Sequence, residues 1–251
     1  MDSIYFMVAA GAVVAGFVQG LSGFAFGMVS MSIWAWVLDP HLAAVLAVFG
    51  GLTGQIIAAV TVRRGFDLAK LLPFALGGLA GVPLGVWVLP HLDVALFKAV
   101  LGTLLVLWCP AMLMSARLPR IERGGLLADA SVGIAGGVMG GIGGFTGVLP
   151  TLWGTLRGWP KDELRAVVQN FNLAMLAVTM GTYLATGLVT ARHLPFFGIV
   201  ALAVLVPVLL GARLYAGISE ERFRQIVLGL LTASGVALLA SAVPVLARRL
   251  L

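Results

Sequence analysis

Long stretches without a charged side chain constrain the fold of this chain more than any other feature of its sequence. Six of them have roughly the 20 residues that a helix needs to cross the hydrocarbon core of a bilayer. They are residues 42–62, 71–90, 99–116, 166–191, 194–212 and 225–247. Only 10% of the residues are charged and 61% are hydrophobic, whereas soluble domains carry about 25% charged residues. We therefore exclude a water-soluble globule and predict an all-α integral membrane protein.

The net charge of +6 would suggest a nucleic-acid partner if the chain were a soluble domain. In a membrane protein, lysine and arginine concentrate in the cytoplasmic loops, and so they set the orientation in the bilayer. We therefore predict a multi-pass protein of the bacterial inner membrane, surrounded by lipid and without a nucleic-acid partner. The sequence leaves open whether the protein forms a homo-oligomer.

Two further apolar segments, residues 3–38 and 126–156, are too long for a single straight crossing. A helix of about 36 residues would extend about 54 Å, against about 30 Å of hydrocarbon. Each segment has a glycine-rich middle, residues 20–27 and 140–147, and glycine readily interrupts a helix. We therefore expect two helical hairpins with arms of about 17 residues, each entering and leaving the membrane on one side. The alternative is eight crossings in which the two long segments are kinked helices.

The two glycine-rich breaks are similar in sequence. Gly20 and Gly23 of the first break correspond to Gly141 and Gly144 of the second at the same offset of 121 positions. Similarity at a fixed offset indicates an internal repeat. We therefore predict two repeats, each made of a glycine-broken helical hairpin followed by three transmembrane helices.

The predicted boundaries are residues 1–116 for the first membrane repeat, 117–125 for a cytoplasmic linker and 126–251 for the second membrane repeat. Because three crossings per repeat is an odd number, the second repeat would be inverted in the bilayer. The two hairpins would then enter from opposite faces, and their glycine tips would meet near the middle of the membrane. The predicted architecture is thus a pair of inverted repeats.

The distribution of basic residues favours this topology. With two re-entrant hairpins, one face collects 12 basic residues and the other 4, whereas eight plain crossings would divide them 9 to 7. The larger group is predicted to be cytoplasmic and consists of Arg63, Arg64, Lys70, Arg117, Arg120, Arg123, Arg157, Lys161, Arg165, Arg213, Arg222 and Arg224. The smaller group consists of Lys98, Arg192, Arg248 and Arg249. A bias of 12 to 4 is large enough to orient the protein.

The breaks are the predicted site for an anion. Lipid cannot satisfy backbone groups that leave a helix inside the membrane, so a cavity is expected there. We expect each second arm to begin directly after Gly23 or Phe145, where its first N–H groups and the helix dipole would favour negative charge. The candidate binding residues at the breaks are Gln19, Ser22, Gly23, Phe24, Gly143, Gly144, Phe145 and Thr146. The alternative is that the glycines only allow close helix packing.

Neutral polar residues elsewhere in the apolar segments complete the candidate site. Hydroxyl and amide groups can donate hydrogen bonds to an anion without adding a fixed charge. These candidates are Thr53 and Gln55 in the first half and Gln169, Asn170 and Asn172 in the second. For each of them the alternative is a hydrogen bond that only joins two helices.

No charged residue lies deep in a predicted crossing, so the sequence gives no proton relay. Asp129, three residues into the fifth apolar segment, is expected to be an interfacial helix cap. The single cysteine and the three histidines have no spacing typical of metal ligands, and no catalytic triad or carboxylate pair is visible. We therefore predict no cofactor, no metal and no enzymatic activity.

Several motifs of this chain together resemble one family. They are Gly-Leu-Ser-Gly-Phe-Ala-Phe-Gly at residues 20–27, Gly-Val-Pro-Leu-Gly at 81–85, Gly-Gly-Phe-Thr-Gly-Val-Leu-Pro at 143–150 and Arg-Gly-Trp-Pro-Lys-Asp-Glu-Leu-Arg at 157–165. This pattern, which covers nearly the whole chain, is similar to the TauE/SafE sulfite exporter family, also called the anion permease family. The run from Phe145 to Pro150 departs from the Ser-Gly-Pro-Pro-like run of many members.

The resemblance implies a carrier for sulfite, sulfoacetate or another small sulfur-containing or organic anion. Together with the predicted site, it leads us to expect a secondary transporter, and more specifically an exporter, that exposes a midplane site alternately to each side. Two alternatives differ in class. A membrane-embedded enzyme would need titratable residues that converge at one depth, and a non-transporting assembly factor would use its polar residues only to join helices.

Overall fold

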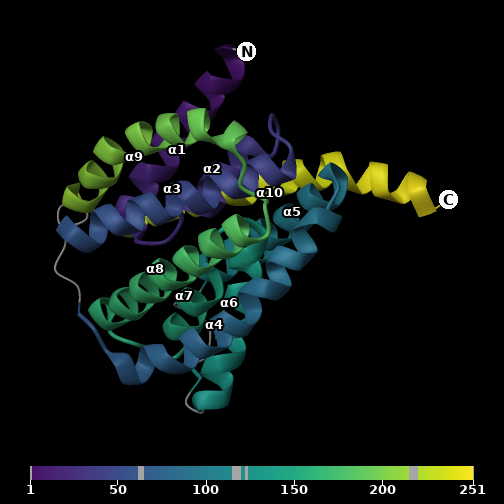
Figure 1. The fold of residues 1–251 in the computed structure, drawn as a ribbon. Coiled ribbons are helices and arrows are strands. Elements are labelled where there is room, and N and C mark those ends of the chain that lie inside the picture. Colours follow the sequence, from purple (N-terminus) through teal and green to yellow (C-terminus); the bar gives the residue numbers. More distant parts are fainter. Residues whose placement is uncertain (1, 62–64, 115–119, 122–123, 215–219, 251) are drawn as a thin grey trace.

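The computed structural model describes residues 2–61, 65–114, 120–121, 124–214 and 220–250 (Figure 1). These residues form helices joined by short loops, and no strand occurs among them. The elements in chain order, with η for short 3-10 helices, are α1 (Asp2–Ser22), α2 (Phe26–Trp34), α3 (Pro40–Thr61), α4 (Leu68–Val88), η1 (Leu89–His91), α5 (Val94–Leu113), α6 (Leu126–Gly143), α7 (Val148–Leu156), α8 (Lys161–Ala185), η3 (Ala191–His193), α9 (Leu194–Leu214) and α10 (Glu220–Leu250). The predicted all-α fold is therefore confirmed.

Within the described residues, seven helices are long and apolar enough to cross a membrane. These segments are Ser3–Ser22, Pro40–Thr61, Leu68–His91, Val94–Leu113, Leu126–Gly143, Ala191–Leu214 and Gln225–Arg249. They confirm a multi-pass membrane protein. α2 and α7 have 9 residues each, about 14 Å of helix, and are too short to span. α8 has 25 residues but is more polar, so its crossing remains a prediction.

Both long apolar segments break at their glycines and fold back. α1 ends at Ser22, and the indole Nε1 of Trp34 at the end of α2 donates a hydrogen bond to the carbonyl oxygen of Met7 over 3.3 Å. Because Met7 is near the start of α1, α2 returns along α1. α6 and α7 form the corresponding hairpin, in which Trp153 Nε1 donates to Asp129 Oδ1 over 2.7 Å. The two segments therefore fold back as hairpins and are not straight or kinked single helices. That each hairpin enters and leaves the membrane on one side remains a prediction.

The arms of the hairpins differ from the prediction in length and in where they begin. The first arms have 21 and 18 residues and the second arms 9 each, instead of about 17 for all four. The second arms begin at Phe26 and Val148, two residues later than predicted. The next helices, α3 and α8, start a few residues after these arms end. Asp39 accepts a hydrogen bond from the N–H of Leu42 over 3.0 Å at the start of α3, and Pro160 directly precedes α8.

Asp129 does not cap α6, so the prediction of an interfacial cap is wrong. The N-cap of α6 is Gly125, which has no side chain to make a capping hydrogen bond. The Asp129 carboxylate instead accepts the hydrogen bond from Trp153 and lies 3.7 Å from Nη1 of Arg157. Both partners lie at the end of α7. Asp129 therefore joins the two arms of the second hairpin.

α8 begins at Lys161, five residues before the predicted crossing that starts at residue 166. Asp162 and Glu163 lie in its first turn, where negative charge is favourable beside the N-terminal end of the helix dipole. Because the sequence prediction defined crossings by the absence of charge, it left this turn out. As a consequence, Lys161 and Arg165 lie on α8 and not in a loop.

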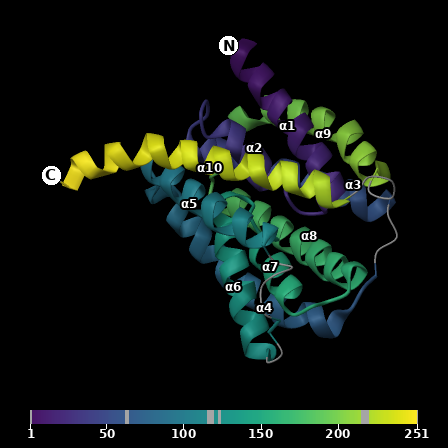
Figure 2. The same cartoon turned by 180° about the vertical axis from the view of Figure 1, so that it is seen from behind.

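Two groups of helices make up most of the molecule (Figures 1 and 2). In one group α1, α2 and α3 pack with α9, and in the other α6, α7 and α8 pack with α4. α5 packs against α10 beside both groups. Each half of the chain therefore contributes one helix to the other half. The packing of α1 on α9 corresponds to the packing of α6 on α4 when the two halves are exchanged.

Glycines allow these exchanged helices to pack with their backbones in contact. A Cβ atom added to Gly81 of α4 would lie 2.1 Å from the carbonyl oxygen of Ile134 on α6. One added to Gly20 of α1 would lie 2.2 Å from the carbonyl oxygen of Val208 on α9, and Gly141 is equally restricted by α4. The alternative explanation of the glycines, close helix packing, is therefore correct for these positions.

Some predictions concern residues outside the part of the chain that the structure describes. The basic residues Arg63, Arg64, Arg117 and Arg123 are among them, as is part of the predicted linker at 117–125. Of the linker residues that are described, Ile121 donates its N–H to the carbonyl oxygen of Leu156 over 2.9 Å. The division into two membrane repeats and their opposite orientation remain predictions.

Candidate functional site

The tips of the two hairpins touch in the interior of the protein. A Cβ atom added to Gly27 would lie 2.8 Å from the carbonyl oxygen of Gly144, and one added to Gly147 would lie 2.8 Å from Cβ of Phe24. Gly23 and Gly144 both have positive φ angles, 85° and 76°. Side chains disfavour this left-handed conformation, so both turns require glycine. The corresponding residues Gly23 and Gly144 thus end the first arms of the two hairpins with the same left-handed turn. Both turns lie at the contact between the tips.

Polar side chains at the first break satisfy its own backbone. Ser22 Oγ accepts hydrogen bonds from the N–H groups of Phe24, over 3.4 Å, and Ala25, over 3.2 Å. Gln55 Nε2 on α3 donates to the carbonyl oxygen of Gly23 over 2.6 Å. Because lipid could not satisfy these backbone groups, the side chains make a break inside the membrane tolerable. Ser22 and Gln55 therefore have a structural role at the break.

Gln19 joins the same two helices one turn earlier. Its Nε2 donates to the carbonyl oxygen of Gly51 on α3 over 2.9 Å. Its Oε1 is buried and has no hydrogen-bond partner among the described residues. Gln19 of α1 thus bonds to the backbone of α3, and Gln55 of α3 bonds to the backbone directly after α1. Each bond joins residues 32 positions apart in sequence.

The second break is fixed by side chains from α8 and α5. The hydroxyl of Thr146 donates to Oδ1 of Asn172 over 2.7 Å, and both residues are buried. Trp108 Nε1 on α5 donates to the carbonyl oxygen of Val148 over 2.8 Å. Phe145 is buried against Gly143, since a Cβ added to this glycine would lie 2.7 Å from the ring. The hydroxyl of Thr146 is therefore used inside the protein.

Two predicted site residues lie away from both breaks. Thr53 Oγ1 donates to the carbonyl oxygen of Phe49 in its own helix, over 2.8 Å. Asn170 Nδ2 donates to the carbonyl oxygen of Gly65 over 3.1 Å, in a bond that is exposed. Gln169, one residue before Asn170, is buried beside Gly23 instead, where a Cβ added to the glycine would lie 2.8 Å from Nε2 of Gln169.

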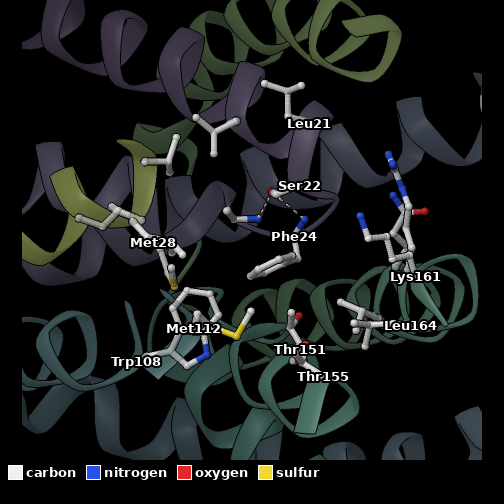
Figure 3. Close-up of a pocket in the computed structure, with 18 of the residues that line it drawn as sticks. Leu21, Ser22, Phe24, Met28, Trp108, Met112, Thr151, Thr155, Lys161 and Leu164 are labelled. Carbon is white, nitrogen blue, oxygen red and sulfur yellow. Dashed lines mark hydrogen bonds between the residues drawn. The ribbon is translucent and has the colours of Figure 1, made fainter. Parts of the chain in front are cut away.

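A cavity of about 290 Å³ adjoins the first break (Figure 3). It lies between the end of α1, the start of α2 and the start of α8, with walls from α5, α7 and α10. Of the predicted site residues, Ser22, Phe24 and Gln169 line it. The others do not: Gln19, Gly23, Thr53, Gln55, Gly143, Gly144, Phe145, Thr146, Asn170 and Asn172. Polar residues that the prediction missed, Thr151 and Thr155 of α7, also line the cavity.

One end of the cavity is basic. Lys161 and Arg165 line it from α8, and they are four positions apart, so they share one face of the helix with Gln169. Arg165 is half-buried, and its Nη2 donates to the carbonyl oxygen of Gly20 over 3.5 Å, across to the end of α1. Lys161 is exposed, so this end reaches the surface. No acidic residue is among those that line the cavity in the described part of the chain.

Lys161 and Arg165, which form the basic end, are not among the predicted site residues. Sequence reasoning used Lys161 and Arg165 only to assign the cytoplasmic face. The spacing of Lys161, Arg165 and Gln169 by four residues each would have placed all three on one face of a helix. The contributions of α5 and α10, with Trp108 and Leu231, depend on tertiary packing and have no signal in the sequence.

The opposite end of the cavity is apolar. Figure 3 shows Trp108 and Met112 on one side of Phe24 and Lys161 on the other. The rings of Phe24 and Trp108 meet edge to face, with centroids 5.8 Å apart and an angle of 78° between their planes. Met28 completes this wall. The cavity therefore offers positive charge at one end and aromatic and thioether surface at the other.

Paired broken hairpins that meet at a buried contact, beside a cavity with a basic end, define a multi-pass helical membrane protein. The model of the family described as Sulfite exporter TauE/SafE matches residues 8–238. The chain therefore belongs to this family of membrane anion transporters, as the resemblance in its motifs indicated. Comparison with curated proteins gave no match, and comparison with solved structures gave none either.

Proposed function

We propose that this protein is a secondary transporter that exports a small sulfur-containing or organic anion, such as sulfite or sulfoacetate, from the cell. Alternating access takes place around the two breaks. The observation that carries the proposal is the contact between the breaks, formed by left-handed turns at Gly23 and Gly144, next to a cavity with a basic end. Membership of a sulfite exporter family supports the transport class.

The anion is attracted by two features of the cavity. Lys161 and Arg165 supply full positive charge at the end that reaches the surface. Ala25, directly before α2, and Met28 in its first turn also line the cavity, and the N-terminal end of a helix carries partial positive charge. The tips themselves contain no charged side chain. An anion is therefore drawn in at one end and held more weakly as it approaches the contact.

Alternating access is supported by the exchange of helices between the halves of the chain. α9 packs on α1 and α4 packs on α6, so each hairpin moves together with a helix from the other half. In inverted-repeat transporters, one group of helices rocks against another around a fixed midplane site. Here the contact between the tips is where the two groups would separate to pass the anion.

Export is the direction that the charges favour. Lys161 and Arg165 belong to the basic group predicted to be cytoplasmic, so the basic end of the cavity collects anions from inside the cell. An inside-negative potential contributes about 2.3 kcal/mol per charge per 100 mV to the exit of an anion. A uniporter needs no proton-carrying carboxylate in the cavity, and the described lining has none.

The test is efflux of sulfite from proteoliposomes under an inside-negative valinomycin potential. Gly23→Ala and Gly144→Ala force alanine into a left-handed turn, and should each reduce efflux at least tenfold because the breaks cannot change shape. Gly187→Ala is the matched control, since Gly187 has a φ of 75° and open space around it. All three changes add similar backbone strain, about 1–2 kcal/mol. Wild-type efflux in both break variants would contradict the proposal.

A further inference from the structure

We infer that Gln169 is the residue that recognises the transported anion, through hydrogen bonds from its side-chain amide beside the first break. This inference rests on the proposed function, because it names the binding residue and the binding position for the same substrate. It follows from the state of the amide, from its place in the cavity wall and from the residue at the corresponding position in the other half of the chain.

The amide of Gln169 is buried without a hydrogen bond. The residue is 3% exposed, and its amide has no hydrogen-bond partner among the described residues. The other buried amide side chains at the breaks, those of Gln19, Gln55 and Asn172, each form a hydrogen bond within the protein. A buried polar group without a partner destabilises the folded chain, and most such groups in native proteins are satisfied. The amide of Gln169 is therefore available to a ligand.

Gln169 lies between the cavity and the first break. It lines the cavity together with Ser22 and Phe24, the residues on either side of Gly23. A Cβ atom added to Gly23 would lie 2.8 Å from Nε2 of Gln169, closer than real Cβ atoms come to other atoms. Glycine at this position therefore makes room for the amide, in addition to forming the left-handed turn. The break and the amide thus border the same part of the cavity.

Ser22 supplies a second neutral donor at this place. Its Oγ accepts two backbone N–H groups, and a serine hydroxyl can donate one bond in addition. That O–H has no acceptor among the described residues. Ala25, directly before α2, also lines the cavity, and the partial positive charge at the start of a helix favours an anion over a cation. Two donors beside this helix end fit an oxyanion, whose charged oxygens form stronger hydrogen bonds than neutral acceptors do.

The second break has an apolar side chain where the first break has Gln169. α3 and α8 begin at the same offset of 121 positions that relates the two breaks. At this offset Gln169 corresponds to Val48, and Gly23 corresponds to Gly144. Val48 is buried and packs on Gly144, since a Cβ added to this glycine would lie 3.5 Å from Cγ2 of Val48. Packing at this position therefore does not require an amide, and the anion binds beside the first break only.

Replacing Gln169 with methionine tests the inference on the detergent-purified full chain. Methionine has a similar length but cannot donate a hydrogen bond, so the dissociation constant for sulfite should rise about tenfold, as measured by calorimetry. Because the amide gives up no partner within the described protein, the Tm without ligand should stay the same or rise. Gln225→Met, at an exposed glutamine of α10 outside the cavity lining, is the matched control and should change neither quantity.

Efflux from proteoliposomes separates recognition of the anion from support of the break. If the amide binds the anion, the half-saturating concentration of sulfite should rise about tenfold in Gln169→Met, and the maximal rate should change much less. Gln169→Val, which reproduces the residue of the other half, is a second variant with the same expected result should methionine prevent folding. A lower Tm with an unchanged half-saturating concentration would show that Gln169 only supports the break, and would overturn the inference.

Two further outcomes separate this inference from the proposed function. Wild-type affinity and wild-type efflux in Gln169→Met would show that the amide bonds only to water, and would overturn the inference while the proposed transporter stands. Failure of the wild-type protein to bind or export sulfite, methanesulfonate or acetate would overturn the proposed function as well.

Discussion

Replacing Thr146 with valine should lower the stability of the protein and leave its affinity for anions unchanged. Thr146 and Asn172 are each 1% exposed, and the threonine hydroxyl donates to the amide oxygen of Asn172 over 2.7 Å. Valine has nearly the shape of threonine, so the change removes mainly this hydrogen bond. A buried acceptor left without its donor costs about 1–3 kcal/mol. At about 2–4 °C per kcal/mol for a chain of this size, a loss of about 2 kcal/mol lowers Tm by roughly 4–8 °C.

Thr53→Val is the matched control for this experiment. The hydroxyl of Thr53 donates to the carbonyl oxygen of Phe49, which belongs to its own helix. Removing it should change stability by less than about 0.5 kcal/mol, or about 1–2 °C. The measurements are thermal unfolding in detergent by intrinsic fluorescence and the dissociation constant for sulfite by calorimetry. Weaker anion binding by Thr146→Val at an unchanged Tm would show that the hydroxyl serves the ligand, and would refute the structural role.

Three other predictions follow from the fold. Gly81→Ala should lower Tm by several degrees, because the added Cβ would lie 2.1 Å from a carbonyl oxygen of α6. The control Gly229→Ala, with open space around the glycine, should raise Tm slightly. Equal Tm shifts in the two variants would contradict the packing of α4 on α6. The pKa of Asp93 lies below its usual value because its carboxylate accepts a hydrogen bond from the N–H of Leu96 and pairs with Arg249. The stability that this cap of α5 contributes is therefore present at neutral pH and is lost as the pH falls below about 4. Asp93→Asn should therefore flatten the loss of Tm between pH 5 and 3, and an unchanged pH profile would be inconsistent with this cap. Single cysteines at positions 120 and 249, without the native cysteine, should be labelled from opposite sides of intact cells, and labelling from the same side would refute the inverted topology.

The helices and their breaks could be predicted because each depends on the composition of a short stretch of the sequence. An uncharged run of about 20 residues indicates a crossing, and a cluster of glycines in a run too long for one crossing indicates a break. The offset of 121 positions between the breaks also has a structural counterpart, since Gly23 and Gly144 share the same backbone conformation. These signals do not depend on which helices pack against each other.

The roles of the polar residues could not be predicted in the same way. Gln19, Gln55 and Thr146 are bonded to partners 32, 32 and 26 positions away, and only the folded chain brings these groups together. The packing of α4 and α9 against helices of the other half of the chain could not be predicted from the sequence either. Glycines allow close packing but do not specify the partner helix. Sequence reasoning therefore located the breaks, but it could not show that several donors assigned to anion binding are bonded to groups at the breaks.

Under the proposed function, the positions of the basic residues would let the site both collect and release an anion. Two cations at a dry tip would bind an anion very strongly, since the attraction between charges grows as the local dielectric constant falls. Lys161 is exposed and Arg165 half-buried, so water weakens their attraction at the end of the cavity that reaches the surface. At the breaks, the carbonyl oxygen of Gly23 is bonded to Gln55 and the hydroxyl of Thr146 is bonded to Asn172. Under the proposed function, the charges would raise the local concentration of anions beside the breaks. The contact between Gly27 and Gly144 carries no charge that would hold the anion there.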